Sequence, residues 1–290
     1  MNSPSTRALL RCTAVPVTMI AMACLASQAR AAEYTKSFTV SGRPSVHVDS
    51  NDGNVRVSTG DSNQVEFRVD YAGLTLDKDL HITATQQGDQ LALSARIVET
   101  RLLLFRNSRK LRIEVRMPKD GDVRVETGDG GIDVANLSGE VDLRSGDGDL
   151  KVSALKGVVH MKTGDGAINA DGMDGKIDAT TGDGRVRLEG RFDALKIRTG
   201  DGSVEASAQT GSRLDSEWKI ETGDGRIEMT LPKDLQADVN ASSGGGRVTS
   251  DIPLAVQGEF SKSSVHGKMN GGGPPLRIHT GDGSIHLRQG

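Results

Sequence analysis

The chain has 290 residues, of which 26% are charged, 3% are aromatic and 36 are glycine, and its formal net charge is −3. This balance argues against nucleic acid as a partner, because neutralising phosphates requires a basic surface. The scarcity of aromatic residues argues against a large globular core, and the moderate charge argues against disorder, so we expect a narrow interior filled by Val, Ile, Leu and Ala.

The first 31 residues have the pattern of a secretory signal peptide. Arg7 and Arg11 form a positive start, and Ala14–Ala26 is an apolar stretch too short to stay across a bilayer. Residues 29–31 (Ala-Arg-Ala) fit the small-x-small cleavage rule. We therefore expect an exported protein of the periplasm, the cell surface or the medium, with a mature chain that begins at Ala32.

Both cysteines, Cys12 and Cys24, lie in this first segment, so the mature chain is expected to contain no disulfide. A second interpretation is a lipoprotein with Cys24 as the lipidated residue, although the three residues before it lack the usual leucine. No later stretch is apolar enough to cross a membrane, so we expect no transmembrane segment in the mature chain.

Residues 32–121 contain several short stretches in which apolar and polar residues alternate. This period of two predicts half-buried β-strands. We interpret the region as the first coils of a repeat structure plus a β-sheet that caps its N-terminal end, because an uncovered end would expose unpaired strand edges. Within it, residues 101–110 (RLLLFRNSRK) combine an apolar run with basic residues. We favour cap packing with solvated arginines, and the alternative is a contact with a membrane surface or a partner.

Residues 122–290 contain a repeated tetrapeptide, Thr-Gly-Asp-Gly. It begins at residues 127, 163, 181, 199, 222 and 280, with variants at 145 and 243, and from 127 to 199 the copies are 18 residues apart. Aliphatic residues alternate on both sides of each copy, and a second glycine turn falls half a repeat away. One 18-residue unit therefore contains two strands and two turns. We expect the glycines to have positive φ and the aspartates to bind amides of their own turn.

Two topologies fit this unit, an antiparallel meander and a coil that stacks on the next copy. We expect the coil, because equal spacing lets like residues stack and explains why the turns repeat chemically. Ordering 18 residues costs roughly 1–2 kcal/mol each, whereas the five or so inward side chains return only about 1.5–3 kcal/mol each, so a coil needs its neighbours. The predicted fold class is all-β: a single-stranded parallel β-helix (β-solenoid) of 18-residue two-strand coils, wound right-handed.

Residues 251–275, which contain Gly, Ser and Pro, interrupt the repeat before its last copy. The strands at an uncovered end of a stack have unpaired backbone groups, which attract other strands. We therefore expect the last coil to be covered by this insertion or by a second copy of the chain, with self-association through the C-terminal coil.

Residues 266–288 (HGKMNGGGPPLRIHTGDGSIHLR) resemble the C-terminal signature of the bacterial candidate-adhesin family of β-strand-repeat proteins, a domain of unknown function. The repeated V-x-L-x-T-G-D-G-x-I strands are similar to those of the family as well, and the resemblance covers residues 38–290. It implies a single-stranded β-helix in an exported protein. Its motifs are glycine turns and alternating strands, which are specific for fold and weak for function. The resemblance carries over no catalytic residue.

The aspartates of the repeat are expected to line one edge of the stack: Asp129, Asp147, Asp165, Asp183 and Asp201. Calcium binding is one interpretation, because calcium prefers clustered oxygen ligands. However, calcium-binding nonapeptide rolls have a different residue order. Carboxylates about 4.8 Å apart repel by only ~1 kcal/mol in water, so turn hydrogen bonds can offset the repulsion. We therefore favour a structural role.

A polysaccharide lyase is the enzyme alternative, because parallel β-helices host that chemistry. A lyase needs a cleft with acidic calcium ligands and a basic catalyst, whereas the outward positions here predict columns of mixed charge. One column contains Arg124, Asp142, His160, Asp178 and Lys196, and the next contains Glu126, Arg144, Lys162, Thr180 and Arg198. Such columns are typical of solvated faces.

Two further features have unremarkable interpretations. His279 and His286 flank the last repeat, and a chance pair is favoured over a metal site. Trp218 falls on an inward position and is expected in the core. The sequence thus predicts an exported, non-catalytic, adhesin-like binding or structural module with no catalytic, cofactor-binding or metal-binding residues. Its expected partner is an envelope or surface protein or glycan. The alternatives are a carbohydrate-active β-helix enzyme and a calcium-binding repeat protein.

Overall fold

The computed structural model describes residues 32–98, 109–256 and 261–290, and Ala31–Gly290 form one compact unit. The predicted signal peptide, both cysteines and residues 101–108 lie outside the described residues. Every element of the described residues is a β-strand, and all the strands join one 23-stranded sheet. The predicted all-β class is therefore confirmed. The described part of the chain contains no helix with the length and hydropathy needed to span a membrane.

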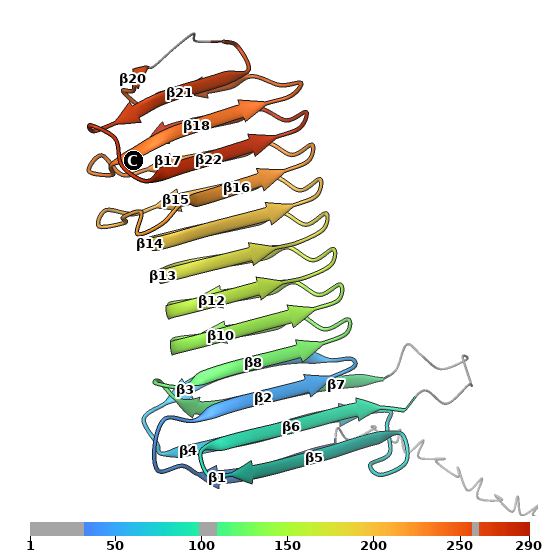
Figure 1. The fold of residues 1–290 in the computed structure, drawn as a ribbon. Coiled ribbons are helices and arrows are strands. Elements are labelled where there is room, and N and C mark those ends of the chain that lie inside the picture. The colour runs from blue at the N-terminus through green and yellow to red at the C-terminus, as the bar shows by residue number, and fades with distance from the viewer. Residues whose placement is uncertain (1–31, 99–108, 257–260) are drawn as a thin grey trace, which may run out of the picture. The chain divides into compact units, whose positions relative to one another are not determined.

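The sheet folds into two walls, here called the front wall and the back wall (Figure 1). From its N-terminal end the front wall contains β5 (Leu80–Gln87), β6 (Gln90–Ile97), β2 (Ser45–Ser50), β8 (Asp122–Thr127), β10 (Ser138–Ser145), β12 (Lys156–Lys162), the second halves of β13 (Ile168–Thr180) and β14 (Val186–Thr199), β16 (Trp218–Thr222), β22 (Pro275–Thr280), β18 (Ala237–Ser243), β21 (Ser264–Met269) and β20 (Ala255–Val256). The back wall contains β1 (Ala32–Thr39), β4 (Gln64–Ala72), β7 (Lys110–Pro118), β3 (Asn54–Gly60), β9 (Ile132–Ala135), β11 (Leu150–Ser153), the first halves of β13 and β14, β15 (Val204–Ala208), β17 (Ile227–Leu231), β23 (Ile285–Gln289) and β19 (Val248–Ser250).

Successive units of the regular repeat pair in parallel. Val123 pairs with Val141, Val141 with Val159, Val159 with Ile177 and Ile177 with Leu195, so each residue lies beside its equivalent one repeat later. Among the described strands, antiparallel pairs occur only towards the two ends of the stack. The regular repeat is therefore a parallel stack and not a meander of hairpins.

Inward side chains fill the space between the walls. Val125, Leu143 and Ile197 occupy one inward column and are at most 1% exposed. Each such side chain stabilises the fold by about 1.5–3 kcal/mol relative to its exposed state. Trp218 is buried as expected, and its ring meets Phe192 edge-to-face at 6.0 Å between centroids.

The Thr-Gly-Asp-Gly corners are held by hydroxyl groups and by close backbone contact. The Thr181 hydroxyl donates to the Gly166 carbonyl of the preceding unit (2.9 Å) and accepts a hydrogen bond from the Gly184 amide (3.3 Å). A Cβ on Gly184 would lie 1.9 Å from the Gly166 oxygen. The expectation of positive φ at the regular corners is wrong, because these glycines are required by close approach. Positive φ occurs instead at the half-repeat turns, as at Gly157 (127°) and Gly175 (138°).

The last unit of the sequence is not the last unit of the stack. β22 lies between β16 and β18, and β23 lies between β17 and β19. The expectation that the insertion or a second copy covers this unit is therefore wrong, and the insertion instead supplies β21, which pairs with β18. Because both backbone edges of the C-terminal coil are paired within the chain, the coil offers neither edge for self-association.

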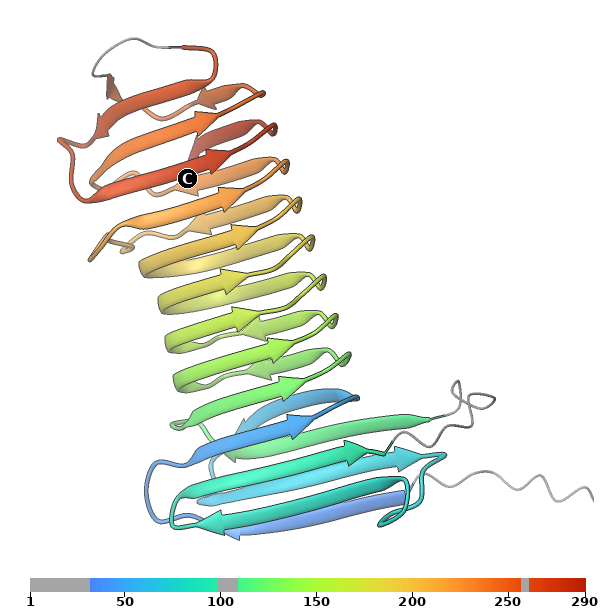
Figure 2. The same ribbon diagram turned by 45° about the vertical axis from the view of Figure 1, so that its right-hand side comes forward.

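A similar displacement occurs at the N-terminal end. The coil of β2 and β3 lies between the coil of β6 and β7 and the first regular unit, β8 and β9. Beyond β6 the front wall has one more strand, β5, whereas beyond β7 the back wall has two, β4 and then β1. Figure 2 shows β1 as the outermost strand at this end.

Candidate functional site

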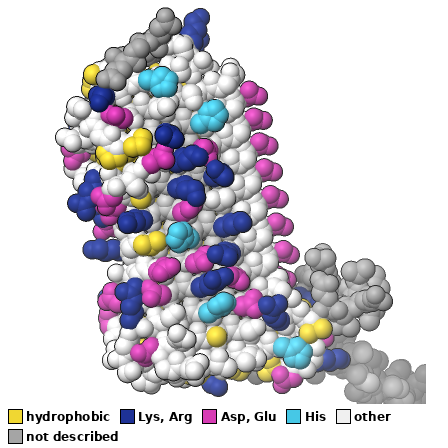
Figure 3. Space-filling model, viewed as in Figure 1, with side chains coloured by type: hydrophobic (Ala, Val, Ile, Leu, Met, Phe, Trp, Pro, Cys, Tyr) yellow, Lys and Arg dark blue, Asp and Glu magenta, His cyan; other side chains and the backbone are white. Residues whose placement is uncertain are grey.

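A row of exposed carboxylates follows the corner edge of the stack (Figure 3). It contains the predicted residues Asp129, Asp147, Asp165, Asp183 and Asp201, and the register adds Asp52, Asp224 and Asp282. Among the described residues, every carboxylate of this row except Asp52 accepts no hydrogen bond and joins no ion pair, so these carboxylates do not bind their own turns as expected. Only Asp52 accepts such a bond, from the Gly53 amide at 2.6 Å.

This row does not gather the ligands of a metal site. The part of the chain that the structure describes contains no group of three or more His, Cys, Asp or Glu side chains that could hold a metal ion. His279 and His286 are also separate, because His279 belongs to the front wall and His286 to the back wall. His279 Nδ1 lies 3.0 Å from the Ser242 hydroxyl, and His286 Nε2 lies 2.9 Å from an Asp251 carboxylate oxygen.

The front wall presents columns of opposite charges. Arg124, Asp142, His160, Asp178 and Lys196 lie beside one another in the register, as predicted. Lys196 Nζ lies 3.1 Å from Asp178. These pairs are partly exposed, and exposed pairs each contribute only about 0–1 kcal/mol. The front wall is therefore a face on which many of the charges are locally paired.

A denser ion-pair network lies at the half-repeat turns. The Arg191 guanidinium bridges Asp174 and Asp193, with 2.6 Å to Asp193, and Arg213 Nε lies 3.3 Å from the same Asp193 carboxylate. The hydrogen bond from Arg191 holds the pKa of Asp193 below its usual value. The network joins the half-repeat bends within β13 and β14 to the turn between β15 and β16, which is a structural role.

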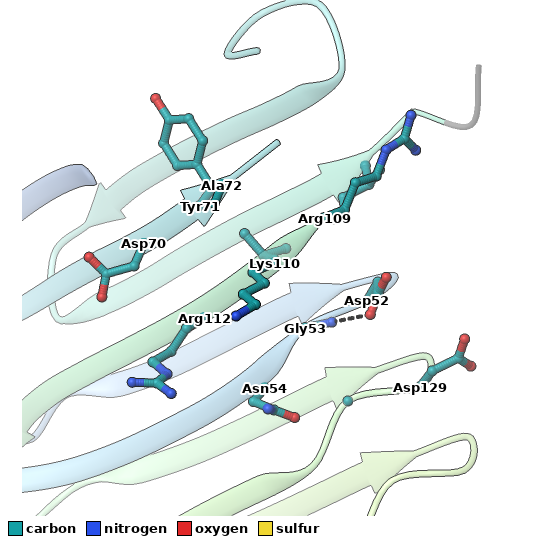
Figure 4. Close-up of a pocket in the computed structure, with 13 residues that line it drawn as sticks. Asp52, Gly53, Asn54, Asp70, Tyr71, Ala72, Arg109, Lys110, Arg112 and Asp129 are labelled. Atoms are coloured by element: carbon teal, nitrogen blue, oxygen red, sulfur yellow. Dashed lines mark hydrogen bonds between the residues drawn. The ribbon is translucent and has the colours of Figure 1, made fainter. Parts of the chain in front are cut away.

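A groove with a cavity volume of about 520 Å³ lies at the N-terminal end of the carboxylate row (Figure 4). It lies between residues 52–54, where β2 turns into β3, and the start of β7. The described residues that line the groove are Asp52, Gly53, Asn54, Asp70, Tyr71, Ala72, Ile97, Arg109, Lys110, Leu111, Arg112, Asp129 and Gly130.

The groove combines three cations with three carboxylates. Arg109, Lys110 and Arg112 lie at the start of β7, and Figure 4 shows Asp52, Asp70 and Asp129 from three neighbouring segments. Among the described residues, none of the three cations is in an ion pair, in contrast to Arg124 or Lys196 on the front wall. The groove is therefore suited to a polar ligand that carries an acidic group.

A second depression of about 270 Å³ continues this surface along the back wall. It shares Asn54 and Arg112 with the groove and extends to Asp133, Asp149 and Lys151. Sequence reasoning identified Arg109 and Lys110 as parts of a basic run, but it missed Arg112, Asn54 and Asp70. Asp70 and Arg112 become neighbours through the antiparallel pairing of β4 with β7, which alternation alone does not reveal.

Comparison with known proteins gives one family and several solved structures. A model of the family described as Toastrack DUF4097 matches residues 44–288. No curated protein matches the chain.

The solved structures that match have low identity. They include a candidate cell adhesion protein from Clostridium sporogenes (14% identity over 90% of this chain and 100% of that chain, TM-score 0.32), a candidate adhesin from Bacteroides fragilis (11%, 89%, 97%, 0.37) and a candidate lipid-binding protein from Parabacteroides distasonis (14%, 88%, 96%, 0.45). At these identities and scores the likeness carries no argument about function.

Proposed function

The chain belongs to the Toastrack DUF4097 family, a domain of unknown function, and on that premise we propose that it is an exported, non-catalytic, adhesin-like binding module. This membership agrees with the family resemblance of residues 266–288. We propose further that the β-solenoid-like stack is a single-stranded, right-handed parallel β-helix of 18-residue units. The parallel registers of β8, β10, β12, β13 and β14 support the coil, and the preference of parallel crossovers supports its hand. The pattern of residues 1–31 supports export.

The proposal rests on which side chains hold the units of the stack together and which remain exposed. Corner hydroxyls such as that of Thr181 hold the preceding unit, the corner glycines allow close approach, and the aliphatic side chains fill the interior. The carboxylate row and the outward columns remain exposed and contribute little to stacking. A repeat of this kind supports a long polar exterior, which is the property that a surface-binding module needs.

Within that exterior, the groove of Figure 4 is the proposed contact with a partner. Its three cations lack ion pairs among the described residues, whereas many front-wall charges are paired. An acidic group of an envelope glycan or protein would pair with Arg109, Lys110 and Arg112 by charge-assisted hydrogen bonds. Asp52 and Asp129 would restrict such a ligand to one that also offers hydrogen-bond donors, whereas Asp70 is already paired with Arg68 at 3.3 Å.

Binding of defined envelope materials by the full chain tests this proposal. The probes are lipopolysaccharide vesicles and solubilised peptidoglycan, with heparin as a reference polyanion. The groove variant is Arg109→Ser with Lys110→Ser and Arg112→Ser. The matched control removes the same charge elsewhere, by Lys162→Ser, Lys176→Ser and Lys233→Ser.

We expect an envelope probe to bind the unmodified chain and the control equally, and the groove variant at least about tenfold more weakly. Equal losses in both variants would mean that the attraction is unspecific charge, and the groove proposal would be wrong. Failure of both envelope probes to bind would reject it as well. Incubation with polygalacturonate or alginate tests the non-catalytic part, because release of unsaturated products would establish a lyase.

A further inference from the structure

The N-terminal end of the stack is stepped. The back wall extends beyond the coil of β6 and β7 by two strands, β4 and β1, and the front wall by β5 alone. Among the described strands, β1 pairs only with β4, and β5 pairs only with β6. An added strand beside β5 would consequently face β1 across the interior.

The inward face of β1 is only partly covered by the rest of the described chain. Tyr34, Lys36 and Phe38 pair with the buried residues Val69, Phe67 and Val65, so they lie on the inward face. Tyr34 and Phe38 pack against the core but are only half-buried, and Ile82 and Ala84 of β5 are half-buried in the same way. Another strand at this end would complete their burial, at about 25 cal/mol for each Å² of apolar surface removed from water.

The free edge of β5 lacks the usual protection of edge strands. Natural edge strands are commonly short, bulged or charged, because unpaired backbone groups attract other strands. β5 is eight residues long, and its sequence LHITATQQ contains no Asp, Glu, Lys or Arg. Its β-branched residues Ile82, Thr83 and Thr85 favour an extended backbone. The backbone of Leu80 is already bonded to Thr75 and Asp77, so the edge that can accept another strand begins at Ile82.

The charge of Lys36 indicates which kind of strand can be added here. Lys36 points inward between Tyr34 and Phe38, its Nζ lies 5.4 Å from the centre of the Phe38 ring, and among the described residues it forms no ion pair. A second copy placing its own β1 here would bring two lysines together, and a second β5 contains no carboxylate to offer. Residues 1–31 contain neither Asp nor Glu, so they cannot neutralise Lys36 either.

We propose that this end of the stack binds an extended strand of another protein. The added strand pairs with the backbone of β5, and its inward side chains follow the order apolar, x, acidic, x, apolar. The apolar side chains pack on Tyr34 and Phe38, and the carboxylate between them meets Lys36. This is recognition by β-strand addition, in which backbone hydrogen bonds give affinity and alternate side chains give specificity. The site is separate from the groove of Figure 4 and does not depend on its proposed role.

Two synthetic peptides test the proposal on the full chain. The fluorescein-labelled peptide TVTDTVT carries the proposed inward order, and TVTKTVT carries lysine in place of aspartate. By fluorescence anisotropy at up to about 1 mM chain, we expect the aspartate peptide to bind at least about tenfold more tightly. Lys36→Glu is expected to reverse this preference, and Lys36→Gln is expected to remove it.

Matched variants separate strand addition from unspecific attraction. Ile82→Lys places a charge on the inward side of β5 and is expected to abolish binding, whereas Thr85→Lys places it on the outward side and is expected to be tolerated. The groove variant is expected to bind the peptides normally. Hydrogen exchange is expected to show fast exchange at the free edge of β5 in the unbound chain and protection with the aspartate peptide.

Several results would overturn the proposal. These are equal affinity for both peptides, no binding of either, or a preference that survives Lys36→Glu and Lys36→Gln. Protection of β5 in the unbound chain would mean that another segment of the chain or a second copy already occupies the position. A concentration-dependent dimer that Ile82→Lys disrupts would identify the second copy as the occupant.

Discussion

Gly184 packs directly on the carbonyl oxygen of Gly166, since a Cβ added to Gly184 would lie 1.9 Å from that oxygen. We therefore expect Gly184→Ala to lower the free energy of unfolding by about 1–3 kcal/mol or more, because the backbone of two units would have to separate. Gly131→Ala is the matched control, because its Cβ would lie 3.3 Å from the nearest atom, the Asp149 carbonyl oxygen. Urea denaturation of both variants checks this, and equal losses would contradict the close-contact explanation.

The hydroxyl of Thr181 is buried and bonded on both sides. Thr181→Val retains the shape but leaves the Gly166 carbonyl and the Gly184 amide without this partner, and it should cost about 1–3 kcal/mol of stability. Thr181→Ser should cost much less, since Ser145 and Ser243 occupy the equivalent corner in two other units and make the same bonds. Thermal unfolding of the pair measures the difference. A valine variant as stable as the serine variant would show that the hydroxyl is dispensable.

The exposed carboxylates of the corner row repel one another weakly. Asp165→Asn, in the middle of the row, is therefore expected to raise stability slightly at low salt, by no more than about 1 kcal/mol, and the gain should vanish at high salt because the repulsion is screened. Unfolding of both proteins in low and high sodium chloride tests the expectation. A loss of stability on neutralisation would mean that the carboxylate makes a stabilising contact.

Calcium gives an independent test of the same row. If the carboxylates bind no calcium, millimolar calcium should leave the melting temperature of the full chain unchanged, because only a ligand that binds the folded state raises it. Magnesium at equal concentration is the ionic-strength control. A rise with calcium alone that Asp165→Asn reduces would establish the calcium-binding alternative.

Asp193 should make stability depend on pH. Its pKa is lowered by the hydrogen bond from Arg191, so the folded state favours the charged carboxylate more than the unfolded chain does. The resulting stabilisation is present above the ordinary aspartate pKa of about 4 and is lost as pH falls through the lower pKa of the folded state. Asp193→Asn should therefore lose less stability than the unmodified chain between neutral and acidic pH. Parallel melting curves across this range decide the matter.

The sequence predicts the features that follow from the alternation of inward and outward residues and from the 18-residue spacing of the corners. The alternation around each corner identifies inward residues such as Val141 and Leu143, and the spacing of 18 identifies their neighbours in the stack. The carboxylate row follows from the same spacing. The reason for the corner glycines does not, because a glycine pattern alone cannot distinguish positive φ from close approach.

Features that depend on the order of units in space were not predicted. The spacing of the last copies loosens, but it does not reveal that β22 lies between β16 and β18. The groove likewise depends on the pairing of Asp70 with Arg112 across β4 and β7. Both arrangements bring together residues far apart in the chain, and the spacing of the repeat does not reveal such contacts.

The position of the final coil has a consequence for how the molecule is completed. A stack built in the order of synthesis could grow by adding each new unit to the last one. Here residues 275–289 must enter between two units that were made earlier, β16–β17 and β18–β19. Folding of this part of the stack therefore cannot finish until residues 275–289 are available, and a chain truncated before them lacks the coil that joins β16–β17 to β18–β19.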